Sequence, residues 1–148
     1  MHFYLEAIEK IIQTSQGMKC ERVNGDTALR ITDFLYDIVV DAEMVIPQSI
    51  RLAYRVTPPL LDVAAEDAVD IYEYFLTLTS QEATMMPFDP DTKTLAIGAK
   101  FKCGTMTDMA GKLDHCLAEL SVFKTTHQTN IREYLLSKRI AFDQKVPK

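Results

Sequence analysis

The chain has 148 residues, of which 47% are hydrophobic and 25% are charged. This composition excludes an intrinsically disordered chain, because it supplies enough apolar surface for a packed core. The length predicts one domain. The net charge of −5 disfavours nucleic acid as the main partner, since phosphate contacts need clustered Lys and Arg side chains.

The cysteine spacing and the lengths of the apolar runs indicate in which cellular compartment the protein lies. Cys20, Cys103 and Cys116 are an odd number without CxxC spacing, which is typical of a reducing compartment and not of a secreted disulfide scaffold. The opening stretch MHFYLEAIEK carries two glutamates and does not read as a signal peptide. No run approaches eighteen apolar residues, so we expect no membrane insertion and a cytoplasmic protein.

The first predicted elements are a helix and a hairpin. Residues 2–16 have apolar side chains at helical spacing and are followed by Gly17, a natural helix end, so they predict an amphipathic helix. Asn24 and Gly25 form the preferred pair for a tight hairpin turn, which places strands near residues 18–23 and 27–32.

One or two further strands are expected before the next helix. The stretch LYDIVVDAEM is rich in β-branched residues and reads as a third strand or as a continuation of the second. Residues 49–57 alternate, with Ile50, Leu52 and Tyr54 on one face and Arg51 and Arg55 on the other. This alternation predicts a half-buried antiparallel strand.

Residues 62–78 return to helical spacing. Glu66, Asp67 and Asp70 lie in the early turns, where the helix dipole favours acidic side chains. The apolar side of this helix is wider than a single surface helix needs, which indicates burial on two sides.

A second hairpin follows. Two strand-like segments flank Asp89 and Asp91, which read either as the start of a metal loop or as the polar tip of a hairpin. A calcium loop would continue D-x-D-x-D-G. Thr92, Lys93 and Thr94 stand there instead, so we interpret the two aspartates as turn residues.

The C-terminal part is predicted to be helical. Thr105 and Asp108 fit a capping box, and an apolar stripe runs from Met109 to Phe123. The polar stretch KTTHQTN interrupts the stripe, so we expect a last short helix capped by Asn130. The whole order predicts an α+β fold, an antiparallel sheet packed by helices as α-β-β-β-α-β-β-α with an extra C-terminal helix.

The predicted domain spans residues 1–140, and residues 141–148 are expected to form a flexible tail. No catalytic, metal or cofactor motif stands in the sequence, which favours a protein without enzymatic activity.

Cys103 lies beside Lys102 and ahead of a helix N-terminus, which would lower a thiol pKa, so it is the best candidate for a reactive group. Cys116 lies on the apolar stripe and reads as a buried structural thiol.

The stretch ATMMPFDPDTKTLAIGAKF, followed by the capped helix from Thr105, resembles the second hairpin and final helix of the type III secretion chaperone-like superfamily. That superfamily includes the YbjN-like bacterial sensory transduction regulators, and the element order over residues 2–123 is similar to it. The resemblance implies a bacterial, homodimeric, non-enzymatic protein that holds an extended segment of a partner protein, or a regulator that acts through protein partners.

On this resemblance, apolar residues of the first helix and of the strand at 49–57 are candidate partner contacts, with plain core as the alternative for each. They are Leu5, Ile8, Ile12, Ile50, Leu52 and Tyr54. The rival hypothesis is a small-ligand-binding protein or an unrecognised enzyme with a pocket between sheet and helices, in which Arg51 and Arg55 would anchor an anion.

Overall fold

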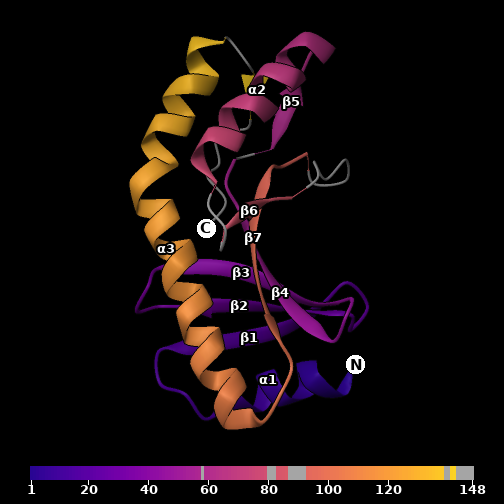
Figure 1. Cartoon of the computed structure of the whole chain (residues 1–148). Coiled ribbons are helices and arrows are strands. Elements are labelled where there is room, and N and C mark those ends of the chain that lie inside the picture. The colour runs from indigo at the N-terminus through magenta and orange to yellow at the C-terminus, as the bar shows by residue number, and fades with distance from the viewer. Residues whose placement is uncertain (58, 80–82, 87–92, 139–140, 143–148) are drawn as a thin grey trace.

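A computed structural model of the chain describes residues 1–57, 59–79, 83–86, 93–138 and 141–142 (Figure 1). An antiparallel sheet of six strands packs with three helices in this part of the chain, so the predicted α+β class is confirmed. The elements are α1 (Phe3–Gln13), β1 (Met18–Val23), β2 (Ala28–Asp33), β3 (Ile38–Val45), β4 (Ser49–Arg55), β5 (Leu60–Asp62), α2 (Ala65–Leu78), β6 (Thr84–Met85), β7 (Ala96–Lys102), α3 (Met106–Ser137) and β8 (Ala141–Phe142).

The sheet has the order β1-β2-β3-β4-β7-β6, and each neighbouring pair is antiparallel. The turn between β1 and β2 contains Asn24 and Gly25, both with positive φ, which confirms the predicted hairpin. The pairing of β6 with β7 confirms the second hairpin. Asp89 and Asp91, at its predicted tip, lie outside the described residues.

The main core lies between one face of the sheet and two helices. α1 packs against β1, β2 and β3, and α3 packs against β3, β4 and β7. Period-two alternation in the strands and helical spacing in α1 and α3 place apolar side chains on this shared interface. Leu29, Ile97 and Leu117, from β2, β7 and α3, are fully buried there.

The predicted break in the last helix is wrong, because α3 is continuous over 32 residues. Asn130 lies inside it and caps nothing. Phe123, His127, Ile131 and Leu135 follow one another at spacings of four, so one face of the helix continues through the polar stretch. Thr, Gln and Asn cost only about 0.7 kcal/mol or less each in a helix interior. The packing of this face therefore outweighs their low propensity.

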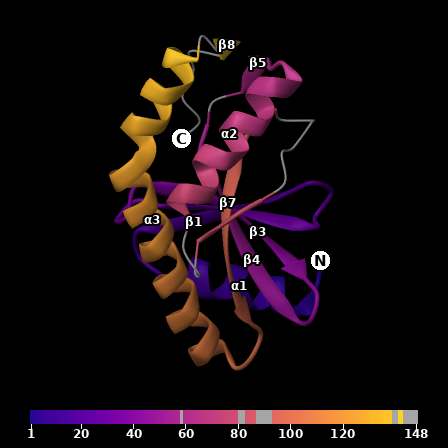
Figure 2. The ribbon, with the colours of Figure 1, turned by 45° about the horizontal axis from the view of Figure 1, so that its top comes forward.

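α3 joins the sheet region to a second region that contains α2, β5 and β8 (Figures 1 and 2). β5 and β8 form a two-stranded antiparallel sheet, and neither strand was predicted. The first two residues of the predicted tail thus belong to β8, while residues 143–148 lie outside the described part.

α2 lies against the C-terminal half of α3 through a small set of side chains. The rings of Tyr74 and Tyr134 stack with centroids 4.0 Å apart and an interplanar angle of 6°. Lys138 Nζ donates to Asp70 Oδ2 at 3.2 Å and lies over the Tyr134 ring. These contacts hold one side of α2 and leave its opposite side free to face solvent.

Candidate functional site

The apolar residues expected to contact a partner lie in the core. Their exposed fractions are 4% or less, so a partner cannot reach them on the surface of this structure. The alternative, plain core, accounts for all of them, because the same spacing that marks a contact face also marks a buried one. They are Leu5, Ile8, Ile12, Ile50, Leu52 and Tyr54.

The two candidate anion anchors lie on the face of β4 opposite its buried side chains, where each holds a carboxylate. Arg51 donates to Glu43 of β3, and Arg55 Nη2 lies 3.4 Å from Asp41 Oδ2. Asp41 also accepts from Arg30 Nε at 3.0 Å, which makes it a bridge between two arginines. An incoming anion would compete with these carboxylates for the same guanidinium groups.

Cys103, the candidate for a reactive group, does not have an activated thiol. Burial raises the pKa of the Cys103 thiol above its usual value, against an opposing effect from the nearby charge of Lys112. The expectation that the position of Cys103 lowers its pKa is therefore wrong, because desolvation of the thiolate outweighs the nearby positive charge. Cys116 is buried in α3, as expected of a structural thiol.

An exposed apolar surface lies on α2, which has apolar side chains on two sides. Ile71 and Phe75 face inward and are 2% and 0% exposed. Val69, Tyr72 and Leu76 face outward and are 58%, 40% and 56% exposed. Spacings of three and four place these last three on one side of the helix, and we call them the α2 stripe.

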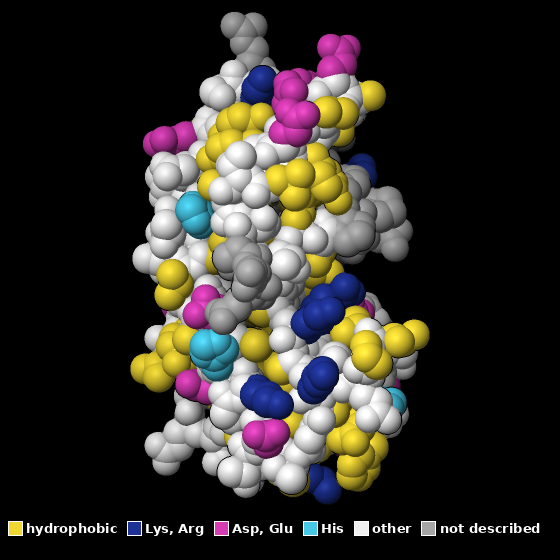
Figure 3. Space-filling model, in the orientation of Figure 1, with side chains coloured by type: hydrophobic (Ala, Val, Ile, Leu, Met, Phe, Trp, Pro, Cys, Tyr) yellow, Lys and Arg dark blue, Asp and Glu magenta, His cyan; other side chains and the backbone are white. Residues whose placement is uncertain are grey.

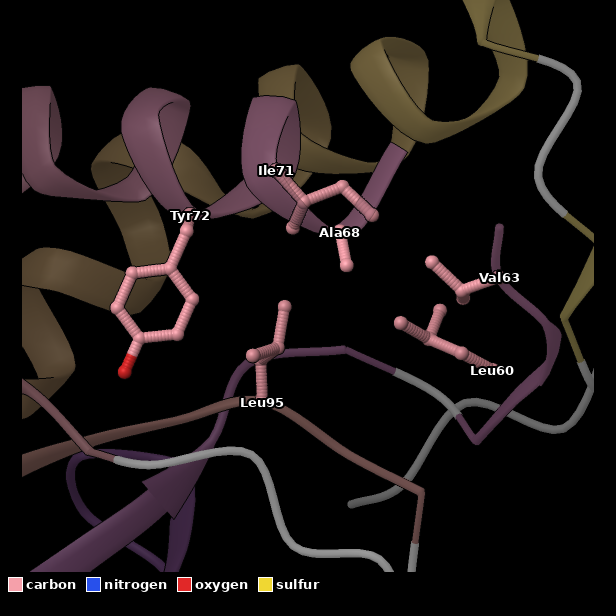
Figure 4. A pocket seen from close by; sticks show the side chains of 6 residues that line it. All are labelled: Leu60, Val63, Ala68, Ile71, Tyr72 and Leu95. Carbon is pink, nitrogen blue, oxygen red and sulfur yellow. The ribbon is translucent and has the colours of Figure 1, made fainter. Parts of the chain in front are cut away.

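The α2 stripe adjoins an apolar pocket of about 170 Å³ beneath the helix (Figure 4). In Figure 4, side chains from α2, from the segment around β5 and from Leu95, just before β7, point toward one common space, with the Tyr72 ring at one end. Tyr72 therefore belongs to both the stripe and the pocket wall, so the two form one continuous apolar surface. The lining residues are Leu60, Val63, Ala68, Ile71, Tyr72 and Leu95.

Acidic side chains border the α2 stripe. Glu66 and Glu73 are exposed on α2, and within the described part of the chain neither has an ion-pair partner. Asp70 is paired with Lys138. In Figure 3, acidic and hydrophobic side chains lie side by side around α2 at the top, whereas Lys and Arg side chains gather lower down over the sheet. Among the described residues, the border of the stripe thus carries more acidic than basic side chains.

The sequence carried one signal for this site, the unusual width of the apolar side of the helix at residues 62–78. Burial on two sides was the expectation, and the structure buries one side within the chain and leaves the other exposed. The pocket had no signal in the sequence, because Leu60 and Leu95 come together with α2 only through the tertiary fold.

Among the described residues, no three His, Cys, Asp or Glu side chains lie close enough together to hold a metal ion. None of the described helices combines the length and apolar character that a membrane span requires. The sequence matches none of the protein-family models and none of the curated proteins with which it was compared.

Proposed function

We propose that this chain is a non-enzymatic protein-binding module, chaperone-like or regulatory, that holds a segment of a partner protein against the α2 stripe and the adjoining pocket. The observation that carries the proposal is the continuity of three exposed apolar side chains with an apolar pocket. Contiguous exposed apolar surface carries an energetic cost for a protein in water, and it marks sites of protein contact.

The size of the pocket favours a peptide side chain over a small molecule. Sites for drug-sized ligands measure roughly 300–1,000 Å³, whereas this pocket measures about 170 Å³. A segment lying along the stripe would insert one apolar side chain into the pocket and lay others on Val69 and Leu76. Side chains of a helix at spacings of three and four are a common platform for such segments.

The resemblance of the sequence to type III secretion chaperone-like proteins supports the same kind of function. It also supports a cytoplasmic homodimer as the working unit. The contacts proposed here differ from those first expected, because the residues of α1 and β4 are in the core and the α2 stripe is exposed.

Affinity capture with matched variants tests the proposal. The tagged protein is incubated with lysate of its source cells, and bound proteins are identified by mass spectrometry. The test variant Val69→Ala/Tyr72→Ala/Leu76→Ala removes the stripe, and the control Leu35→Ala/Val122→Ala removes apolar side chains elsewhere that are at least as exposed. Circular dichroism verifies that both variants are folded.

We expect a partner that the wild type and the control retain and that the stripe variant loses. The same bound proteins on all three would show that the stripe does not bind the partner, and would overturn the proposal. Limited proteolysis of the complex then identifies the bound segment, which we expect to be protected only in the presence of wild-type or control protein.

A further inference from the structure

We infer that the α2 stripe selects a partner segment whose apolar side chains are flanked by Lys or Arg, an inference that rests on the proposed function. The positions of two glutamates support this inference. Glu66 lies three residues before Val69, and Glu73 lies four residues after it, so both adjoin the stripe on the same edge of the helix. Both are exposed, and no cation of the described residues neutralises either one.

The two edges of the stripe differ in chemistry. One edge leads through Tyr72 and Ala68 into the apolar pocket, and the other carries the carboxylates of Glu66 and Glu73, which pair with no described residue. A segment that binds here therefore meets apolar surface on one side and negative charge on the other. Asp70 contributes less to this edge, because Lys138 already holds its carboxylate at 3.2 Å.

Charge decides which segments bind well. Lys or Arg beside Glu66 and Glu73 lies within a Debye length, about 8 Å at physiological salt, so its attraction is only partly screened. An acidic segment would meet like charges at the same place, and like-charge juxtaposition suppresses wrong partners. The net charge of −5 of the whole chain acts in the same direction.

A second copy of this chain fits the stripe less well. An antiparallel two-fold pairing of two α2 helices presents the same patch twice and brings both glutamate edges to the same side. Four carboxylates would then lie close together with no cation between them, which disfavours this pairing. A basic, apolar segment of another protein meets no such repulsion.

Two synthetic peptides test the charge selection. Both carry leucines at helical spacings of three and four, and they differ only in having Lys or Glu at every charged position. Fluorescence anisotropy of each labelled peptide with the full chain gives the dissociation constant. We expect the Lys peptide to bind at least about tenfold more tightly at low salt, with the difference shrinking as salt is added.

Charge reversal localises the effect. The variant Glu66→Lys/Glu73→Lys is expected to reverse the preference toward the Glu peptide. The control Glu21→Lys/Glu119→Lys makes the same change in net charge on β1 and α3 and is expected to keep the preference of the wild type. The variant Val69→Ala/Leu76→Ala is expected to weaken the binding of the Lys peptide.

Equal affinities for the two peptides would overturn the inference, as would failure of both to bind or a preference that survives the reversal at Glu66 and Glu73. The proposed function would stand in those cases if the capture experiment still shows a partner lost with the stripe. Sedimentation of the protein without peptide tests whether the stripe instead binds a second copy of the chain. A dimer that dissociates in the Val69→Ala/Leu76→Ala variant would assign the stripe to a second copy and overturn the inference.

Discussion

The sheet region and the α2 region use apolar side chains in opposite ways. In the sheet region, α1 and α3 close over one face of the sheet, and Ile50, Leu52 and Tyr54 of β4 are 4% exposed or less. In the α2 region, a helix with apolar residues on two sides is covered on one side only. An apolar pattern in the sequence thus indicates which face of an element is suited to burial. It does not show whether the residues that bury this face belong to the same chain.

The two regions also differ in how they are held together. In the sheet region, six strands are joined to one another by continuous ladders of backbone hydrogen bonds. Among the contacts of the described residues, a ring stack and an ion pair attach α2 to α3, and a few inward apolar side chains attach it to the rest. We therefore expect α2 to open locally at a lower free energy than the sheet.

The largest expected effect is in the sheet region. Leu52 of β4 is fully buried between the sheet and the helices. The substitution Leu52→Ala leaves a cavity there and should lower the free energy of unfolding by about 2–5 kcal/mol. Urea denaturation measures this change. The control Lys100→Ala, at an exposed position on β7, should stay within about 0.5 kcal/mol of the wild type. Similar losses for both would contradict the assignment of Leu52 to the core.

High pH should affect the same core through Tyr54. Burial, with a smaller contribution from the charge of Asp37, raises the pKa of Tyr54 to about 12. The unfolded chain loses this proton near pH 10, and the folded chain retains it until about pH 12. Stability is therefore complete below pH 10 and falls as the pH rises toward 12, by roughly 2–3 kcal/mol in total.

The variant Tyr54→Phe isolates this effect, because it keeps the ring and removes the titrating hydroxyl. Urea denaturation at a series of alkaline pH values should show a steeper loss of stability for the wild type than for Tyr54→Phe. Parallel curves for the two proteins would mean that the Tyr54 hydroxyl ionises as easily in the folded chain as in the unfolded one.

Local signals in the sequence account for much of the sheet region. The Asn24-Gly25 pair specifies its turn through positive φ, and the alternation at residues 49–57 specifies which face of β4 is buried. The cap of α3 is also local, since Thr105 Oγ1 accepts from the backbone N–H of Asp108 at 3.2 Å, as predicted. Each of these features needs only a few consecutive residues, so the sequence is sufficient to predict it.

The α2 region depends on contacts between distant residues. β5 has three residues and β8 has two, which is too short for a periodic pattern, and Leu60 pairs with Phe142, more than half of the chain away. The pocket likewise joins Leu60 to Leu95 and α2. The sequence predicted the wide apolar side of α2, and no local rule could tell that one half of it would stay exposed.

The ring stack between α2 and α3 gives a smaller expected effect. Tyr74→Ala removes the partner of Tyr134 at 4.0 Å, and stacked aromatic pairs contribute about 0.5–1.5 kcal/mol beyond the area they bury. Hydrogen exchange should show faster exchange of α2 amides, while the amides of β2, β3 and β4 keep their wild-type protection. Equal acceleration in both regions would mean that α2 and the sheet unfold as one unit.

The smallest expected change in stability is at the α2 stripe. Val69 and Leu76 are more than half exposed, so their outer atoms bury little surface on folding. Ala has the highest helix propensity, and the variant Val69→Ala/Leu76→Ala should therefore stay within about 0.5 kcal/mol of the wild type in urea denaturation. A loss as large as that of Leu52→Ala would show that the stripe supports the fold of its own chain. A negligible loss would mean that this apolar surface contributes nothing to folding, which leaves binding as the property that the stripe can serve.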